Sequence, residues 1–293
     1  MTLTPPAALA RKGFFKAPLA LFRRGASAPR PRVVRRLPVE RDWPVAAIVA
    51  VQVGILVVAI GTWEIAADTG WIDAFFWSRP SAIGETLLTF FESGRAVSDT
   101  LFTFRSTILG FALGTTLGAA FGLSFWWSRN YARIVQPYII CFESLPKLAL
   151  APLIILVFGI GLASKVALAS ALTFVVSTLT AYAGVKAVDQ DGERLFYSLG
   201  ATRWQVFTKL VVPSCVPWII SILRVNIGLA LTGAVVGEFI ASEQGLGRAI
   251  LYAGQTYEIA LVWVAVMVLS VLSITMYVAV SWLESRLRRG VGQ

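Results

Sequence analysis

The chain of 293 residues is 57% hydrophobic and only 14% charged, with a net charge of +10 and a mean hydropathy of +0.73. A soluble domain usually carries about 25% charged residues, so this composition excludes a globule coated by polar groups and favours a surface that faces lipid. The sequence has no histidine, and its two cysteines, Cys141 and Cys215, lie in apolar stretches, which excludes His-dependent metal sites and catalytic triads and indicates no disulfide framework.

The first 42 residues are rich in proline, alanine and arginine. They hold ten Lys and Arg residues against two acids, Glu40 and Asp42, which is typical of a disordered basic tail. The first long apolar run begins near Pro44, too late and too long for the core of a signal peptide, although the tail is also similar in composition to an Arg-rich transit peptide. We expect residues 1–42 to be a cytoplasmic tail that either sets topology by its charge or docks on anionic lipid or a partner.

Six apolar runs follow, each near the roughly 20 residues that a membrane-crossing helix needs. They are Trp43–Trp63, Ser106–Ser128, Leu148–Ser164 with a start reaching back past Glu143, Val166–Val185, Leu210–Gly237 and Ile259–Leu283. The pattern predicts an all-α polytopic membrane protein with about six transmembrane helices, its membrane domain covering residues 43–289.

The connections between these runs differ in their content of basic residues. With the N-terminus in the cytoplasm, the cytoplasmic segments 1–42, 127–135, 186–210 and 284–293 hold 19 of the 26 Lys and Arg residues. Cytoplasmic loops carry an excess of such residues, so this orientation is expected.

Between the first two runs, Pro80 and Ser81 open a shorter amphipathic helix that is expected to lie along the outer interface, with one apolar face made of Ile83, Leu87, Leu88 and Phe91.

The second run carries four glycines spaced four residues apart: Gly110, Gly114, Gly118 and Gly122. This spacing keeps all four on one stripe of a helix, where small residues let another backbone approach closely. The stripe predicts helix packing, either within the chain or at a subunit interface or the wall of a pathway.

The third run is interrupted by Pro146 and Pro152, each of which removes a backbone donor. Broken helices of this kind often line transport pathways.

Charges within or at the ends of spans are functional hypotheses by default, and we assign four to a translocation pathway: Glu143, Lys147, Arg224 and Glu238. Their alternative role is structural, as paired or snorkelling charges. Arg224 and Glu238 are about 21 Å apart along a continuous helix, so they cannot pair with each other there.

The loop between the fourth and fifth runs, about residues 186–213, carries bulky apolar residues on a short, partly helical soluble segment. Such groups favour a docking surface over a loop folded back onto its own spans. The residues assigned to it are Asp191, Glu193, Phe196, Leu199, Gly200, Ala201, Trp204, Phe207 and Pro213.

In this loop the chain resembles the permease subunits of ATP-binding-cassette (ABC) importers of the nitrate, sulfonate and taurine type. Their cytoplasmic signature is Glu-Ala-Ala, three residues, Gly, nine residues, Ile, one residue, Leu-Pro. Gly200, Leu210, Val212 and Pro213 stand at the matching offsets, whereas Arg194-Leu195-Phe196 replaces the triplet. Further similar stretches are Arg79-Pro80-Ser81, Leu148 to Gly161, Tyr182 to Asp189 and Gly237 to Gly247, so the resemblance runs from about residue 78 to 288.

The resemblance implies a type I ABC importer permease in the bacterial inner membrane, not itself an enzyme. Its implied partners are a second permease chain (identical or not), two cytoplasmic ATP-binding subunits and an extracytoplasmic solute-binding protein, within membrane lipid and without nucleic acid. No glycine of the sequence is followed by lysine, so the chain lacks a P-loop. We therefore expect no cofactor on this chain, with ATP and magnesium held by the partner ATPase.

The resemblance also implies a small solute that is anionic, such as nitrate, a sulfonate or taurine, or alternatively a pyrimidine precursor or another organic solute. A stand-alone channel or secondary transporter is the main alternative from another class, and it is expected to show inverted repeats. A membrane-embedded enzyme needs clustered acid–base, nucleophilic or metal-binding residues, which four scattered charges do not supply.

Overall fold

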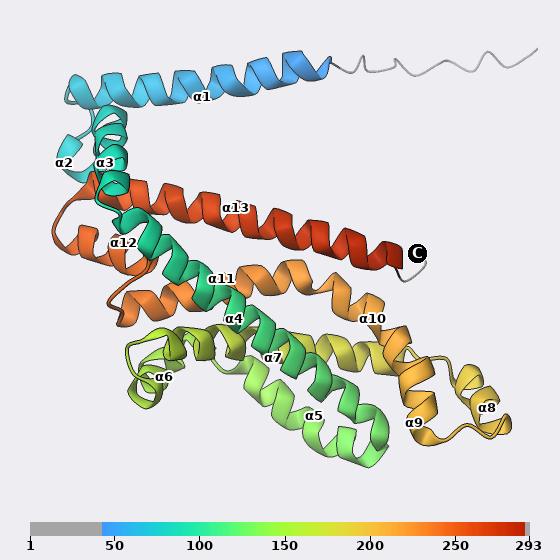
Figure 1. Cartoon of the computed structure of the whole chain (residues 1–293). Helices are drawn as coiled ribbons and strands as arrows, with labels where there is room; N and C mark the ends of the chain where they lie inside the picture. The colour runs from blue at the N-terminus through green and yellow to red at the C-terminus, as the bar shows by residue number, and fades with distance from the viewer. Residues whose placement is uncertain (1–42, 291–293) are drawn as a thin grey trace, which may run out of the picture. The chain divides into compact units, whose positions relative to one another are not determined.

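The computed structural model describes residues 43–290 (Figure 1). The expected basic tail, residues 1–42, lies outside the described residues. The chain divides between Gln52 and Val53 into two units, and each is described by itself. All regular elements of the described part are helical, and five helices are long and apolar enough to cross a membrane, or six if one bent pair counts as a single span. The all-α fold with about six spans is therefore confirmed.

The first apolar run forms α1 (Val45–Asp68), which begins in the first unit and continues into the second. Within the second unit, the valine, isoleucine and leucine side chains between Val53 and Ile60 are exposed, as expected for a helix whose solvent is lipid. Near its end, the Glu64 carboxylate accepts hydrogen bonds from the backbone N–H of Ser81 at 3.0 Å and from its hydroxyl at 2.7 Å. Glu64 thereby caps the start of a later helix.

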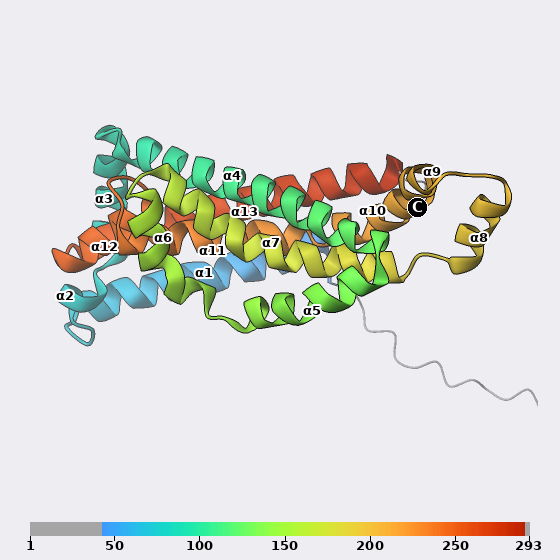
Figure 2. The same ribbon diagram turned by 90° about the horizontal axis from the view of Figure 1, so that it is seen from below.

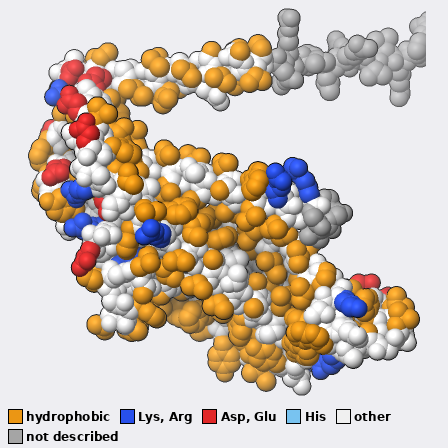
Figure 3. Space-filling model, viewed as in Figure 1, with side chains coloured by type: hydrophobic (Ala, Val, Ile, Leu, Met, Phe, Trp, Pro, Cys, Tyr) orange, Lys and Arg blue, Asp and Glu red, His pale blue; other side chains and the backbone are white. Residues whose placement is uncertain are grey.

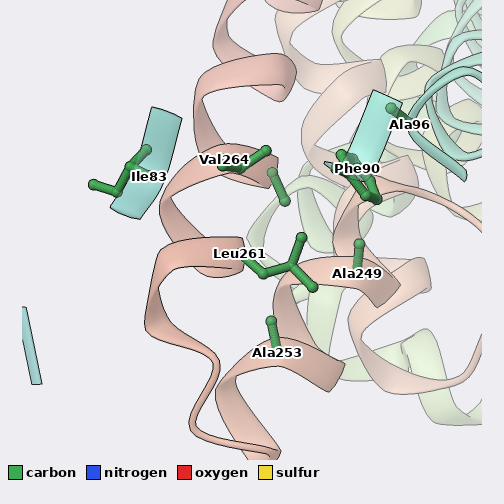
Figure 4. Packing of buried hydrophobic residues seen from close by; sticks show 8 residues of the cluster. Ile83, Phe90, Ala96, Ala249, Ala253, Leu261 and Val264 are labelled. Carbon is green, nitrogen blue, oxygen red and sulfur yellow. The ribbon is translucent and has the colours of Figure 1, made fainter. Parts of the chain in front are cut away.

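That later helix is α3 (Pro80–Glu92), which follows the short α2 (Ala74–Trp77) and starts with proline at its first position. Ile83 and Phe90 of α3 are buried against α12 (Leu246–Gln255) and α13 (Ile259–Gly290), as Figure 4 shows. The residues of the expected apolar face divide between two environments. Its outer members, Leu88 and Phe91, are exposed, because α3 turns the Ile83–Leu87–Phe90 row toward α13.

The second span, α4 (Arg95–Ser124), packs along its length against α7 (Leu162–Lys186), and the two run side by side in Figures 1 and 2. The expected start at Ser106 was wrong, because α4 begins at Arg95 and includes Asp99 and Thr103. Charged and polar residues extend this helix beyond its apolar run, because backbone N–H groups of another segment donate hydrogen bonds to their side chains. A 3₁₀ turn, η1 (Phe125–Trp127), follows α4.

All four glycines of the stripe face α7. A Cβ on Gly114 would overlap the Thr173 hydroxyl oxygen and lie 2.5 Å from the carbonyl oxygen of Ser170, and the other three stripe positions are equally filled. Without side chains, the α4 carbonyls are accessible: Thr178 donates to Gly118 O at 3.1 Å and Thr173 to Gly110 O at 3.4 Å. The structure thus places the stripe in a contact within the chain, where polar groups of α7 replace a hydrophobic driving force that lipid cannot supply.

The third span is broken into α5 (Arg129–Ser144), the 3₁₀ turn η2 (Lys147–Leu150) and α6 (Ala151–Phe158). The two arms are bent by 81°, and the bend includes Pro146, whose ring carries no N–H to continue the helix. The expected break is therefore present. The expected end at Ser164 was wrong, because α6 stops at Phe158 and Leu162 already starts α7.

The fifth span is also broken, which its apolar run did not indicate. After α8 (Gln190–Ser198) and α9 (Arg203–Val206), a π-helical stretch, η3 (Phe207–Val211), leads into α10 (Val212–Ser221). The backbone then breaks at Ile222 before α11 (Leu223–Ile240). Pro213 and Pro217 lie in α10 and each lacks a backbone donor, so the carbonyls four residues before each proline, in η3 and in the first turn of α10, lose their usual helical partner.

The surface of the second unit, over its described residues 53–290, is mostly apolar between two ends that carry charge. In Figure 3, acidic and basic side chains gather near α2 and α3 at one end and near α8, α9 and the end of α13 at the other. In Figures 1 and 2 the helices α4, α7, α11 and α13 run between these ends. A broad exposed apolar surface of this kind is stable only in a bilayer.

Candidate functional site

The loop predicted as a docking surface forms two short helices, α8 and α9, which we call the α8–α9 segment (residues 186–213). Asp189 starts α8, because its carboxylate accepts from the N–H groups of Asp191 at 3.0 Å and Gly192 at 3.1 Å. Thr202 and Gln205 form a capping box that starts α9. Strong local signals at both starts explain why a polar segment of this length is helical rather than irregular.

Gly200 lies in the turn between α8 and α9. Its φ of +80° is left-handed, and a Cβ at this position would meet nothing within 4 Å. The turn is closed by hydrogen bonds from Gly200 N to Tyr197 O at 3.0 Å and from Ala201 N to Phe196 O at 3.0 Å. Glycine is therefore required for its backbone conformation and not for a close approach of another backbone.

The bulky residues assigned to the docking surface divide into two groups. Phe196, Ala201 and Phe207 pack inward against a buried cluster that includes Val206 and Val211. Leu199 and Trp204 point outward, with 78% and 62% of their surface exposed. Among the acidic members, Asp191 pairs with Arg194 at 3.1 Å on the exposed side, and Pro213 lies in the first turn of α10. The inward group holds the segment in place, and the outward group is available to a partner.

Aromatic rings and one arginine attach α9 to the end of α4. The Trp204 and Trp127 rings stack with centroids 6.1 Å apart, and Phe207 lies 5.5 Å from Trp127. The Arg203 guanidinium donates to the carbonyl of Trp127 at 2.7 Å and lies 5.7 Å from the Trp126 ring. These contacts attach α9 to η1, which directly follows α4.

The four charges assigned to a pathway do not form one cluster. Glu143 and Lys147 lie on either side of the α5–α6 bend, with Lys147 Nζ 3.3 Å from the Glu143 carboxylate and donating to the Glu143 carbonyl at 2.9 Å. This lysine thereby satisfies a carbonyl at the end of α5 that the helix itself leaves free. Arg224 and Glu238 lie at opposite ends of α11 and contact different partners.

Arg224, in the first turn of α11, pairs with Glu284 of α13. Glu284 is only 2% exposed and also contacts Arg288 at 2.8 Å. The carboxylate thus lies between two guanidinium groups, one from each helix, beside the break at Ile222. This ion triad fastens the start of α11 to the last turns of α13.

Replacing Arg224 by methionine tests whether this charge acts in structure or in transport. Arg224→Met leaves the buried Glu284 with Arg288 as its one remaining partner, and we expect it to destabilise the protein, because a buried carboxylate loses a charge-assisted hydrogen bond. The measurement is the thermal midpoint of the purified protein in detergent. The double variant Arg224→Met/Glu284→Leu should recover part of the loss. An unchanged midpoint together with abolished uptake would instead place Arg224 in the pathway.

Glu238 is fully buried where α11 ends and α12 begins. Its carboxylate accepts from Gly247 N at 2.8 Å and from the Thr103 hydroxyl at 3.0 Å. The neighbouring Asp99 accepts from Gly245 N at 2.9 Å, and Thr103 Oγ1 accepts from Leu246 N at 3.0 Å. Side chains of α4 and α11 therefore satisfy the free N–H groups at the start of α12, and they hold the 241–247 connection against α4.

Several buried polar residues of the structure were not found by sequence reasoning. Lys165 is fully buried and donates to the carbonyls of Ile160 and Ala241. Asn226 lies at the centre of the bundle and donates to Thr115 at 3.0 Å and to Ser177 at 2.7 Å, which joins α4, α7 and α11. An asparagine inside an apolar run was a usable signal for Asn226. No sequence signal indicated that Lys165 and Asp99 are buried, because both lie in segments that were predicted to be loops.

The described residues offer no constellation for metal chemistry, since residues 43–290 contain no group of three or more His, Cys, Asp or Glu side chains that could hold a metal ion. What the geometry does provide is a helical bundle with two broken spans, buried ion pairs, and a short two-helix segment fastened to it.

A family model described as "Binding-protein-dependent transport system inner membrane component" matches residues 110–289. The formylaminopyrimidine transport permease protein of Halalkalibacterium halodurans is 36% identical over 177 residues, which cover 60% of this chain and 71% of that protein. The riboflavin transport system permease protein of Chloroflexus aurantiacus is 29% identical over 89% of this chain and 95% of its own length. The taurine transport system permease protein of Escherichia coli is 29% identical over 84% of this chain and 91% of its own.

Solved structures with a similar fold include an inward-facing methionine ABC transporter, with a TM-score of 0.55, 18% identity, and coverage of 70% of this chain and 98% of that chain. An amino acid ABC transporter matches with a TM-score of 0.53 and 21% identity, covering 69% of this chain and 97% of that chain. At these identities the likeness concerns the fold.

Proposed function

Because the chain belongs to the family of binding-protein-dependent transport system inner membrane components, we propose that it is the permease subunit of an ATP-driven importer and is coupled to its ATPase through the α8–α9 segment. The chain is a non-catalytic, multi-pass component of the inner membrane with the type I ABC importer permease architecture. Family membership does not favour a stand-alone channel or secondary transporter.

The observation that carries the coupling proposal is that large apolar side chains are exposed on a segment whose other apolar residues pack against the bundle. Leu199 and Trp204 are exposed on α8–α9, and large apolar groups on a soluble segment are typical of a partner surface. Phe207 and Arg203 connect the same segment to η1. A partner that moves Trp204 therefore moves the ends of α4 and α10 as well.

The mechanism that we propose is alternating access. Two ATP-binding subunits close on ATP, the α8–α9 segment transmits the movement, and a pair of permease chains turns from inside-open to outside-open. The breaks at Pro146 and Ile222 are positions where parts of spans can rotate relative to each other. In this proposal the ATPase binds at the α8–α9 end, which is cytoplasmic together with the N-terminus, and a solute-binding protein delivers solute at the α2–α3 end.

The solute that we propose first is a small anion of the sulfonate or taurine class, and it is supported by the taurine relative, which matches 84% of this chain. A second candidate is a pyrimidine-type organic solute, which the relative at 36% identity favours. The four assigned charges do not decide between them, because Lys147 and Arg224 each have an acidic partner.

Reconstitution of the transporter tests the proposed function. The purified chain should show no ATP turnover, because it has no P-loop, and turnover and uptake should appear when the ATPase subunits and the binding protein are added in liposomes. Uptake is measured in parallel with radiolabelled taurine and formylaminopyrimidine. ATP turnover by the chain freed of co-purified ATPase would contradict the proposal, and uptake of only one solute identifies the class.

A further inference from the structure

A basic cavity lies between the end of α7 and the start of α5, beside the α8–α9 segment. It has a volume of about 410 Å³, and its lining includes Arg129, Arg133 and Lys186, one acid, Glu193, and the aromatic residues Phe125 and Tyr182. Three cations against one carboxylate give the cavity a net positive charge. Its size is within the range of small-ligand sites.

None of the three cations belongs to any ion pair formed within residues 43–290, where the paired basic residues are Arg79, Lys147, Arg194, Arg224 and Arg288. Arg129 and Arg133 are one turn apart on the same face of α5 and repel each other. Lys186 lies 4.2 Å above the Tyr182 ring, which orients its charge at the cavity without neutralising it. An anion between these groups converts their repulsion into attraction.

An apolar groove lies farther along α5 and α7, the two helices that also line the basic cavity. It has a volume of about 210 Å³ and is lined by Val135, Tyr138, Ile139 and Phe142 of α5, Phe174, Val175 and Thr178 of α7, and Phe121 of α4. Phe174 and Tyr182 are eight residues apart on α7, so the groove lies about 12 Å from the basic cavity along the helix axis. The two hollows share one wall.

A row of aromatic rings forms that wall. Phe174 lies 5.7 Å from Phe121, Phe121 lies 5.3 Å from Phe125, and Phe125 lies 5.0 Å from Tyr182. The row leads from the apolar groove to the cations. Cationic side chains lie at one end of this wall and apolar side chains at the other. This order matches the charged headgroup and the acyl chain of an anionic phospholipid.

We propose that this cavity and groove bind one anionic phospholipid, with its phosphate among Arg129, Arg133 and Lys186 and an acyl chain along the Phe121–Phe174 wall. Guanidinium groups bind phosphate by paired hydrogen bonds, and basic pockets between helices at the cytoplasmic surface bind anionic headgroups. The proposal rests on the proposed function only in placing this end of the molecule at the cytoplasmic leaflet. A lipid held here contacts both α5 and the start of α8, through Gln190 and Glu193, so membrane composition would act on the coupling segment.

Native mass spectrometry of the permease–ATPase complex in detergent tests the proposal. Dioleoyl phosphatidylglycerol and dioleoyl phosphatidylcholine are titrated separately into the wild type and the variants Arg129→Gln, Arg133→Gln and Lys186→Gln. Arg286→Gln is the matched control, because Arg286 is exposed near the same end of the molecule but does not line the cavity. We expect each cavity variant to bind phosphatidylglycerol about fivefold more weakly, since one cation near an anionic headgroup contributes ~1 kcal/mol, with phosphatidylcholine binding and the control unchanged.

Three results would overturn the proposal. Equal phosphatidylglycerol binding by the wild type and all cavity variants would show that the lipid binds elsewhere. Displacement of the lipid by millimolar inorganic phosphate would identify free phosphate as the ligand. Loss of ATPase subunits from the variants with unchanged lipid binding would assign the cations to the ATPase. Failure of the proposed function gives a different result from failure of the lipid proposal. In that case the wild-type chain would retain no ATPase, while lipid binding to the chain itself could still be measured.

Discussion

Gly114→Leu is expected to prevent α4 from packing against α7 and to lower sharply the yield of folded protein. A side chain at this position meets backbone as well as side chain, with Ser170 Cα at 2.9 Å from the first added atom. Backbone atoms cannot move aside by a change of rotamer, so the two helices must separate. The helix pair also includes the Thr173 and Thr178 hydrogen bonds to α4 carbonyls, which a wider spacing breaks.

The expected loss is about 3 kcal/mol, the upper end of the range for overpacking, which is on the order of a hundredfold in the folded-to-unfolded ratio. The measurement is the monodisperse fraction in size-exclusion chromatography after detergent extraction, together with the thermal midpoint. Gly228→Leu is the matched control, because it places the same side chain in the span helix α11 where nothing lies within 4 Å. If both variants gave wild-type yield, the close approach of α4 and α7 would be refuted.

Gly200→Val is expected to uncouple the permease from its ATPase while the membrane helices remain folded. The residue has a φ of +80°, which costs a side-chain-bearing residue about 1–2 kcal/mol and is a genuine outlier for a β-branched one. The α8–α9 turn would relax to another conformation, and Leu199 and Trp204 would then move away from their positions on the docking surface. We expect ATPase retention to fall about 5- to 30-fold and uptake to fall with it.

The measurement is a pull-down of ATPase subunits by the permease, with the amount of membrane-inserted permease determined in the same samples. Gly200→Asn is the matched control, because asparagine tolerates the left-handed conformation better than other residues with a side chain. It should retain most of the ATPase. If Gly200→Val retained both full ATPase binding and full transport, the α8–α9 segment would not be the coupling element.

Many features of the fold could be predicted because they depend on residues that are close in the sequence. A run of apolar side chains as long as a bilayer is thick predicts a span wherever it occurs, and proline interrupts a helix for a covalent reason, as at Pro146. The spacing of the four glycines defines a stripe for the same local reason. Local chemistry also places helix starts at Asp189 and Thr202, although neither was used to predict one.

The errors have a common physical cause. The start of α4 was placed at Ser106 because Asp99 and Arg105 ended the apolar window, yet Asp99 is acceptable in a buried helix once Gly245 N–H donates to it. The fifth span was predicted as one helix, because the hydropathy of an apolar run does not indicate where the backbone breaks. Its break at Ile222 accompanies the contact of Arg224 with Glu284, a residue 60 positions away.

The sequence alone therefore determined the class of protein, the number of spans, the broken third span and the position of the polar segment that carries the predicted docking residues. The tertiary structure alone decided which helix the glycine stripe faces, which partner each buried charge has, and that Gly200 is needed for its backbone angle. It also decided that Phe196 and Phe207 point inward while Leu199 and Trp204 point outward. The physical reason is that hydrophobic periodicity acts over one or two helical turns, whereas the pairing of buried polar groups depends on residues that packing brings together from distant parts of the chain, as the hydrogen bond from Thr103 to Glu238 shows.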